Sequence, residues 1–340
     1  MLFALVSPRA GLAQNQEAGS LYVAGTWASQ QVKFYDYKCF GGSSCSWTRT
    51  VWTDKILYPK IDVFMNRWNV RVLTDTGVPS DTLAKVQLGV EFVSYDPSTG
   101  QLDFTVNAEV DTGTLAGVEV AVDFTVLWTD GTFVEAIPVS NDCIGTNRHS
   151  CDDTHFSFGV PPTFQLAGVG VKNFTIRRAG GTAVALERLH LGLSGSIMGT
   201  DLQHTLDCGF IGADPAVSTV CEADGVGIVF DPAVLDPDGV NYAYSEAVDG
   251  IRTLPYPDSY FPASSPLPSD FVMGLKAFDL RYDSGAHPVH YMDVGCMDYE
   301  WDGTQLNFNW EGRLWEVAHP AGGTPHALQS VDSTCFIAME

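Results

Sequence analysis

A short acidic and aromatic segment near the C-terminus has the residue types of a carbohydrate-binding face. Flat aromatic rings cover the apolar C–H faces of a sugar, and neighbouring carboxylates accept hydrogen bonds from its hydroxyl groups. The alternative is that these rings belong to a hydrophobic core, where large aromatic residues usually lie. The turn signal that surrounds Trp301 favours exposure of its ring. The candidate site residues are Asp298, Tyr299, Trp301, Asp302 and Trp310.

A second aromatic cluster surrounds the first pair of cysteines and has the same two interpretations. Either its rings pack into a core, or some of them form a flat binding surface. Its members are Phe34, Tyr35, Tyr37, Trp47 and Trp52.

One loop has the closely spaced oxygen ligands that suit calcium. The candidate ligands are Asp236, Asp238 and Asn241, grouped around a glycine. The segment lacks a full calcium-binding loop with its bidentate glutamate, and a plain turn explains the same residues. Calcium is therefore the one cofactor that the sequence suggests, and a protein without any cofactor is the alternative.

The eight cysteines fall into four pairs that are close in the sequence. We predict that each pair is a disulfide, because three of the pairs bracket short polar loops where a covalent bond would fix the end of a hairpin. Zinc ligation is the rival interpretation, but no Cys-x-x-Cys pair occurs. Disulfides indicate an oxidising compartment. The predicted bonds are Cys39–Cys45, Cys143–Cys151, Cys208–Cys221 and Cys296–Cys335.

No constellation of nucleophile, base and stabilising group is recognisable, so the sequence predicts a non-catalytic protein. Asp-Thr-Gly occurs at 75–77 and at 111–113, as in aspartic-protease loops. That chemistry needs two carboxylates brought together from equivalent lobes, whereas Asp111 ends an alternating run before a glycine and is interpreted as a turn residue. His155, close to Cys151, is interpreted as a polar loop residue rather than a metal ligand.

The elements that must position these residues are β-strands. Apolar and polar residues alternate over 102–110 and 118–128, a pattern typical of strands with one face in a core and one in water. No helical periodicity is convincing, and short antiparallel strands with regular turns indicate β-sandwiches. The predicted turns include 96–100, 130–131, 180–181, 224–225 and 302–303.

Two sequence blocks recur three times along the chain. The first block is an aromatic residue, a polar residue, an aliphatic residue and an arginine, and it occupies 68–71, 174–177 and 278–281. The second is an aliphatic residue followed by glycine, at 88–89, 191–192 and 294–295. The offset between the second and third copies is 104 residues for the first block (274−170) and for the turn that follows the second block (303−199). Conserved spacing across two blocks indicates tandem modules of one fold.

The predicted fold is therefore all-β, with three tandem antiparallel β-sandwich modules related by an internal repeat and stapled by disulfides. The loop at 143–151 is expected to join the first two modules, and 208–237 to be an insertion in the second. The predicted segments are 1–13 (remnant of a signal peptide), 14–50 (leading strands and disulfide loop), 51–140 (module 1), 160–254 (module 2), 255–268 (proline-rich linker) and 269–340 (module 3).

Part of the first module resembles a known family. Its hydrophobic residues and turns at 58–63, 70–72, 88–90, 99–102 and 123–128 follow a pattern similar to that of the H-type lectin domain. The resemblance implies a six-stranded antiparallel sandwich, a commonly trimeric assembly, and binding of sugars such as N-acetylgalactosamine. The family's sugar-contacting residues find no match in this chain, so no site residues are carried over.

Charge and localisation signals narrow the choice of partners. The formal net charge is −23, which argues against nucleic acid and anionic membrane surfaces, since both need a basic footprint. No stretch is long and apolar enough to span a bilayer. The apolar run at the N-terminus ends in small residues, which predicts cleavage after Ala13 and secretion, although a retained N-terminal strand is the alternative.

These observations predict a secreted, non-catalytic carbohydrate-binding or adhesion protein. The alternative is a structural subunit of an extracellular filament or surface layer built from repeated β-sandwiches. The expected partners are glycans or other copies of the chain, and the second of these would give a homo-oligomer.

Overall fold

The structure is a computed structural model of the chain. It describes residues 16–23, 26–40, 44–73, 82–113, 117–145, 150–212, 218–233, 240–247, 257–258, 271–282, 291–296, 298–301, 306–309 and 328–339. Every regular element in these segments is a β-strand, which confirms the all-β prediction. Within the same segments there is no helix that could cross a membrane.

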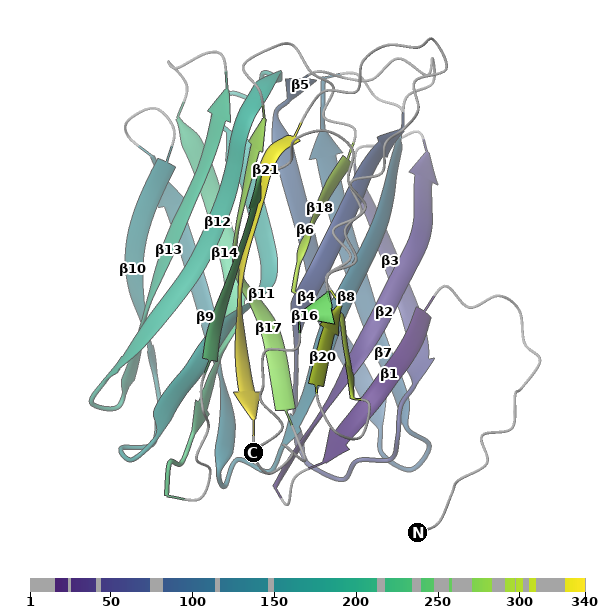
Figure 1. The fold of residues 1–340 in the computed structure, drawn as a ribbon, viewed down its shortest axis with the longest axis vertical. Coiled ribbons are helices and arrows are strands. Elements are labelled where there is room, and N and C mark those ends of the chain that lie inside the picture. The colour runs from purple at the N-terminus through teal and green to yellow at the C-terminus, as the bar shows by residue number, and fades with distance from the viewer. Residues whose placement is uncertain are drawn as a thin grey trace, which may run out of the picture.

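The strands form three large antiparallel sheets and one small sheet (Figure 1). Sheet I has the order β1 (Gln16–Val23), β2 (Trp27–Phe40), β8 (Gly117–Thr129), β4 (Lys60–Leu73) and β18 (Tyr291–Gly295). Sheet II has the order β3 (Ser44–Trp52), β7 (Gln101–Asp111), β6 (Lys85–Asp96), β11 (Gln165–Arg178), β14 (Thr219–Phe230) and β9 (Val134–Ile144).

Sheet III has the order β10 (Ser150–Phe158), β13 (Asp201–Gly212), β12 (Val184–Met198), β17 (Phe271–Tyr282), β21 (Leu328–Met339) and β15 (Val240–Ala247). The short strand β5 (Thr82–Leu83) pairs with one end of β12. The small sheet has the order β16 (Pro257–Asp258), β20 (Leu306–Asn309) and β19 (Asp298–Trp301). β16 is the described part of the predicted linker.

The alternation found in the sequence produces the core. In β7 every second side chain is buried, and β8 follows the same rule until its end, where both faces are covered. Buried side chains from all three large sheets form one continuous hydrophobic cluster. Half of sheet I (β2, β8, β4) packs on half of sheet II (β3, β7, β6), where Phe104 lies 4.9 Å from Phe124 between ring centroids. The other half of sheet II contacts β10, β12 and β13 of sheet III.

Three aromatic rings meet where the three sheets come together. Trp68 on β4 lies 5.4 Å from Phe174 on β11 and 5.2 Å from Phe278 on β17, and the two phenylalanines are 5.3 Å apart between ring centroids. All three rings are buried. They are the aromatic residues of the recurring sequence block.

Each of the strands β4, β11 and β17 carries a β-bulge shortly before its aromatic residue. A bulge adds one residue to a strand and increases its local twist. The register shifts fall between Met65 and Arg67, between Val171 and Asn173, and between Leu275 and Ala277.

Three strand pairings, which we call seams, join the halves of the large sheets: β4 with β18, β11 with β6, and β17 with β12. At each seam the aromatic residue of the first block lies opposite the aliphatic residue of the second block. The pairs are Trp68 with Val294, Phe174 with Leu88, and Phe278 with Leu191. The two blocks found in the sequence are therefore partners across the seams.

Two expectations about residues 208–237 are wrong. Most of this segment is not an insertion, because β13 and β14 occupy 201–212 and 219–230. The sequence at 224–225 is not a turn, since Gly225 lies within β14 opposite Val171. Glycine is needed there for packing: an added Cβ would lie 2.6 Å from the carbonyl oxygen of Gly170. In contrast, Gly131 has φ +78° and lies in a turn, as predicted.

The four predicted disulfides are all present. No cysteine is left free. Cys39–Cys45 and Cys143–Cys151 each connect the ends of two successive strands, and Cys208–Cys221 connects β13 to β14. Cys296–Cys335 ties the end of β18 to β21.

Candidate functional site

The carbohydrate-binding residues predicted near the C-terminus lie mostly outside the described region. The backbone of Asp298, Tyr299 and Trp301 forms β19, in which Trp301 pairs with Leu306. Their side chains are outside the description, as are Asp302 and Trp310 entirely. The choice between a binding face and a core at this hairpin therefore stays a prediction.

The predicted calcium loop also lies mostly outside the described residues. Asn241 lies on β15 opposite Phe336, while Asp236 and Asp238 are outside the described residues. Within the described region, one group of three side chains has ligand atoms close enough to share a metal ion: Cys143, Cys151 and Cys208. All three are in disulfides, so they offer no thiolate to a metal.

The second aromatic cluster divides into a buried part and an exposed part. Phe34 and Trp47 are buried, with ring centroids 5.8 Å apart. Tyr35 is 38% exposed and Trp52 is 52% exposed. The side chains of β3 alternate between the two faces, and Trp52 falls on the outer one because Cys45, Trp47 and Val51 point inward.

The outer face of sheet II beside Trp52 is polar. Trp52 lies opposite Gln101, and the next outward pair on the same two strands is Thr50 opposite Asp103. The Asp103 carboxylate accepts hydrogen bonds from Thr50 Oγ1 at 2.5 Å, Ser94 Oγ at 2.8 Å and Gln101 Nε2 at 3.1 Å. These bonds, above all that from Thr50, lower the pKa of Asp103. A charged acceptor is thus fixed close to an exposed indole.

A similar outer face occurs on β10 in sheet III. Phe158 lies opposite Asp201 and is 78% exposed, and Phe156 lies opposite Gln203. Trp52 and Phe158 both stand seven residues after the cysteine that is the second residue of their strand (52−45 and 158−151). We call the first the Trp52 face and the second the Phe158 face.

Matching threonine pairs support the correspondence between the two faces. The hydroxyls of Thr48 and Thr105 are 3.0 Å apart on the Trp52 face. Those of Thr154 and Thr205 are also 3.0 Å apart on the Phe158 face. Each pair stands at the same register position relative to its exposed aromatic residue.

A buried polar network lies behind the Phe158 face, between β9, β10 and β13. His204 Nδ1 contacts Asn141 Oδ1, and Ser157 Oγ lies 3.0 Å from His204 Nε2. The Asn141 amide nitrogen faces the carbonyl oxygens of His204 and Asp153. This orients Asn141 Oδ1 toward the imidazole and assigns the proton of neutral His204 to Nδ1.

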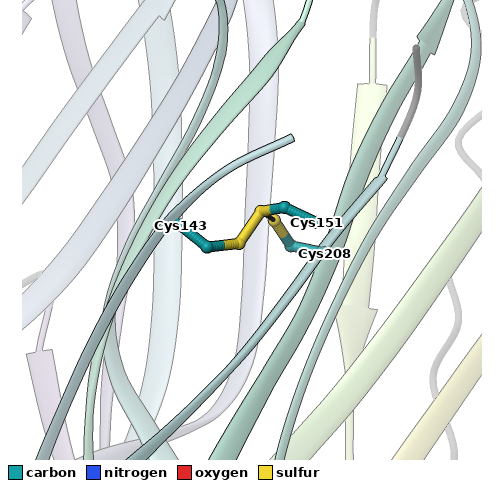
Figure 2. A group of neighbouring side chains, drawn as sticks. All are labelled: Cys143, Cys151 and Cys208. Carbon is teal, nitrogen blue, oxygen red and sulfur yellow. Dashed lines mark hydrogen bonds between the residues drawn. A yellow bond between two sulfur atoms is a disulfide. The ribbon is translucent and has the colours of Figure 1, made fainter. Parts of the chain in front are cut away.

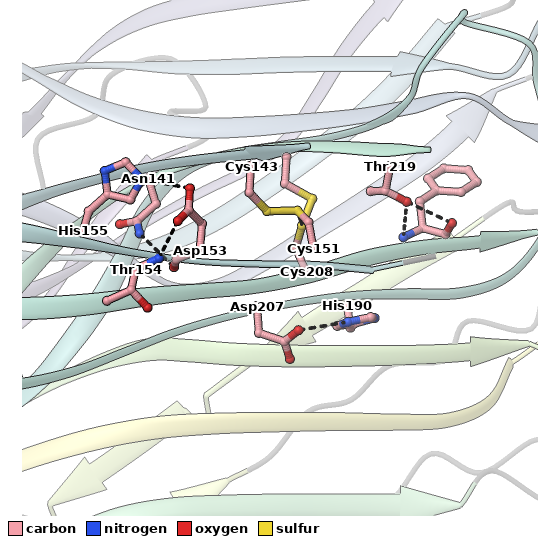
Figure 3. Close-up of a disulfide and its surroundings, with 12 residues drawn as sticks. Asn141, Cys143, Cys151, Asp153, Thr154, His155, His190, Asp207, Cys208 and Thr219 are labelled. Atoms are coloured by element: carbon pink, nitrogen blue, oxygen red, sulfur yellow. Dashed lines mark hydrogen bonds and ion pairs between the residues drawn. A yellow bond between two sulfur atoms is a disulfide. The ribbon is translucent and has the colours of Figure 1, made fainter. Parts of the chain in front are cut away.

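The network maintains a neutral imidazole. Burial, and then repulsion from His155, lowers the pKa of His204 to about 4. The two imidazoles are stacked with centroids 6.2 Å apart. Figure 3 shows His155 beside Asp153, where His155 Nε2 lies 3.2 Å from Asp153 Oδ2. His155 is on β10, so the expectation of a loop residue is wrong.

The Ser157 hydroxyl, the His204 imidazole and the Asn141 amide contact one another in the same order as the nucleophile, base and orienting group of many hydrolases. However, Ser157 Oγ is also 2.7 Å from the main-chain oxygen of Pro138, so its single proton is shared between two acceptors. Ser157 thereby bridges β10 to β9. We interpret the network as a structural link between the two sheets.

The sequence contained usable signals for two of these features. His204 stands between Leu202 and Leu206 in an alternating run, which predicts that it faces the core. The position of Trp52 relative to Cys45 and Trp47 predicts the outer face by the same rule. The sequence 111–113 is a turn as predicted, where the Gly113 amide donates to Asp111 Oδ1 at 2.9 Å. Residues 75–77 lie outside the described segments.

Comparisons with known proteins identify no relative of this chain. No family model, no curated protein and no solved structure matches it.

Proposed function

We propose that the chain is built from three related six-stranded modules, and that it is an extracellular, non-catalytic carbohydrate-binding protein. The proposed modules span residues 27–129, 134–230 and 240–339. These bounds differ from those expected from the sequence, because each of the first two modules now begins with two successive strands that a disulfide connects.

The order of the strands supports the repeat. In every proposed module the first, sixth and third strands lie side by side in one large sheet: β2-β8-β4, β9-β14-β11 and β15-β21-β17. If the two-residue strand β5 is left out of the count, the fourth, fifth and second strands lie side by side as β6-β7-β3 and β12-β13-β10. In the third module β18 and β19 together take the fourth place, followed by β20 and β16.

Each module therefore shares its sheets with its neighbours. The fourth strand of one module pairs with the third strand of the next, and these pairings are the three seams. The bulges, the aromatic triangle and the aromatic–aliphatic pairs recur once at each seam. This recurrence is the principal argument for three modules of one fold around a common centre.

The first copy of the repeat differs from the other two at the position four residues before its aromatic residue. Gly170 and Gly274 stand four residues before Phe174 and Phe278, whereas Phe64 stands four residues before Trp68. A Cβ added at Gly274 would lie 2.7 Å from the ring of Phe64, and one at Gly170 would lie 2.9 Å from it. The space that the two glycines leave is thus filled by the ring of Phe64 together with that of Phe336, whose centroids are 5.8 Å apart.

The observation that carries the functional proposal is the exposed Trp52 indole next to the charged, hydrogen-bonded Asp103. An exposed ring stacks on a sugar, and a fixed carboxylate orients its hydroxyl groups. The corresponding Phe158 face would provide a second site, so binding through both would gain avidity. Secretion is compatible with the four disulfides, and glycans are the proposed partners.

A glycan array tests this proposal. The protein is applied with and without calcium, and hits are titrated by calorimetry against Trp52→Ala and Asp103→Asn. We expect Trp52→Ala to weaken binding about tenfold or more, because a stacked ring at a binding hot spot contributes roughly 2 kcal/mol. Leu57→Ala is the matched control, since Leu57 is 81% exposed and lies outside the Trp52 face. An array without hits, or equal binding by all variants, would refute the proposal.

The alternative function, a structural subunit of an extracellular filament or surface layer, is favoured by one separate observation. Phe156, Phe158 and Met198 are exposed by 51%, 78% and 57% on the outer face of sheet III. Clustered apolar residues of this kind often form contacts between proteins. Concentration-dependent association in analytical ultracentrifugation, abolished by Phe158→Ser, would support this second function.

A further inference from the structure

Two disulfides of the second proposed module lie against each other. Cys143–Cys151 connects β9 of sheet II to β10 of sheet III, and Cys208–Cys221 connects β13 of sheet III to β14 of sheet II. Figure 2 shows Cys208 beside the Cys143–Cys151 bond. Cys151 Sγ is 3.2 Å from Cys208 Sγ, although the two are not bonded to each other.

Each cysteine of this group has a second cysteine directly opposite it on a neighbouring strand. Cys143 pairs in register with Cys221, and Cys151 pairs in register with Cys208. Opposed residues in antiparallel sheets have Cα atoms about 4.5–5.5 Å apart, which is within the range that a disulfide spans. The same four sulfurs can therefore be joined in either of two ways with little movement of the backbone.

We propose that this group is a thiol–disulfide exchange site that converts its two bonds between sheets into two bonds within sheets. The co-reactant is a low-molecular-weight thiol. Cys143 and Cys151 are each 7% exposed, whereas Cys208 and Cys221 are fully buried. The external thiolate therefore enters at the Cys143–Cys151 bond.

The exchange proceeds in three balanced steps, each a thiolate attack on a disulfide sulfur. The external thiolate bonds to Cys143 Sγ and releases Cys151 as a thiolate. Cys151 then bonds to Cys208 Sγ, its neighbour at 3.2 Å, and releases Cys221 as a thiolate. Cys221 finally bonds to Cys143 and releases the external thiol, so no net oxidation or reduction takes place.

The product has Cys151–Cys208 within sheet III and Cys143–Cys221 within sheet II. Both covalent ties between the sheets at this edge of the second module are then lost. The edge keeps its packing, the hydrogen bonds between Thr219 Oγ1 and the backbone of Phe210, and the network around His204. The external thiol thus acts as a catalyst that uncouples β9 and β14 from β10 and β13.

The remaining disulfides provide an internal control. Cys39–Cys45 connects two successive strands of the first module, as Cys143–Cys151 does in the second. In the part of the chain that the structure describes, only the group around Cys151 brings three cysteine sulfurs within 4.8 Å of one another. Cys39–Cys45 can be reduced by the thiol, but it has no neighbouring disulfide with which to exchange.

Non-reducing peptide mapping tests the proposal. The folded protein is incubated near pH 8 with a small amount of 2-mercaptoethanol, quenched in acid, alkylated and digested at low pH. We expect the Cys151–Cys208 and Cys143–Cys221 peptides to form together and to exceed any other non-native pair by about tenfold or more, because proximity favours them. Cys39–Cys45 and Cys296–Cys335 should acquire no new cysteine partner.

A double variant, Cys208→Ala with Cys221→Ala, removes the acceptor bond. In this variant the mercaptoethanol adduct on Cys143 should accumulate, visible by mass, together with a free Cys151 thiol. The mapping of the natural chain decides the question even if the variant fails to fold. Reduction of Cys143–Cys151 with Cys208–Cys221 left intact, or new pairs spread evenly over all eight cysteines, would overturn the proposal.

Discussion

The rings of Phe174 and Phe278 lie 5.3 Å apart, although β11 and β17 belong to different sheets. The contact exists because β11 and β17 also pack against β4, which brings Trp68 to both rings. The residues that recur in the sequence are thus not three separate cores. They form one shared contact between the three large sheets.

Truncation of either phenylalanine should therefore destabilise the whole chain. We expect Phe174→Ala and Phe278→Ala each to lower the free energy of unfolding by about 3–5 kcal/mol, measured by urea denaturation. The double variant should cost less than the sum, because the first cavity already removes contacts of the second ring. Additive effects would mean that the two rings belong to independent cores.

The glycines of the second block should differ in their tolerance of alanine. A Cβ at Gly192 would lie 3.3 Å from Ala277 Cβ, a tight contact, whereas one at Gly89 would collide with the side chain of Asn173, including its Cγ at 2.9 Å. We expect Gly89→Ala to cost about 1–3 kcal/mol and Gly192→Ala less than about 1 kcal/mol. Thermal denaturation compares them, and the reverse order would show that the seam between β6 and β11 is looser than described.

Acid should destabilise the protein through His204. Its pKa is lowered to about 4 in the folded state, against about 6.5 in an unfolded chain. The unfolded state therefore binds the proton first, and the stability from neutral His204 is lost as pH falls from about 6.5 to 4, by up to about 3 kcal/mol. Denaturation of His204→Gln at several pH values should lack this loss, while His155→Gln should retain most of it. Parallel pH profiles for the natural chain and His204→Gln would contradict the assignment.

Substitution of three tryptophans should distinguish a ring that stabilises the fold from rings that bind glycans. Trp47→Ala removes a buried ring and should cost about 3–5 kcal/mol, whereas Trp52→Ala should change stability by less than about 1 kcal/mol. The sequence predicts that Trp301→Ala resembles Trp52→Ala, with weaker glycan binding and a nearly unchanged melting temperature. A large fall in the melting temperature of Trp301→Ala would place that ring in a core.

Local features of the fold were predictable because they depend on neighbours in the sequence. Alternation of apolar and polar residues predicted the strand at 101–111, and short spacing along the chain predicted three of the four disulfides. The segment at 219–230 was missed because Gly225 and Gly227 interrupt its pattern. Both glycines are required by packing, since a Cβ at Gly227 would collide with the side chain of Leu202. A glycine that makes room for another strand is indistinguishable, in a single sequence, from one that makes a turn.

The sharing of sheets could not be predicted from local patterns. Pairing of Phe174 with Leu88 joins positions far apart in the chain, and period-two alternation specifies which face is buried but not which strand is the neighbour. At the candidate site, the alternation of side chains along β3 was enough to predict that Trp52 faces outward. The polar residues near it, Ser94 and Asp103, could not be predicted, because their positions depend on the register between β6 and β7. The close approach of Cys151 to Cys208 could not be predicted either, because it depends on the register between strands that are far apart in the sequence.

The seam between β4 and β18 sets a limit on how the chain can be shortened. It joins an early strand to a late one, so a chain that ends after β17 would keep the pairing of β4 with β8 but would expose the other edge of β4. Unpaired strand edges recruit strands from other molecules. We therefore expect a chain truncated after β17 to associate with other copies through the exposed edge of β4, and a chain that retains β18 to avoid this association because β18 covers that edge.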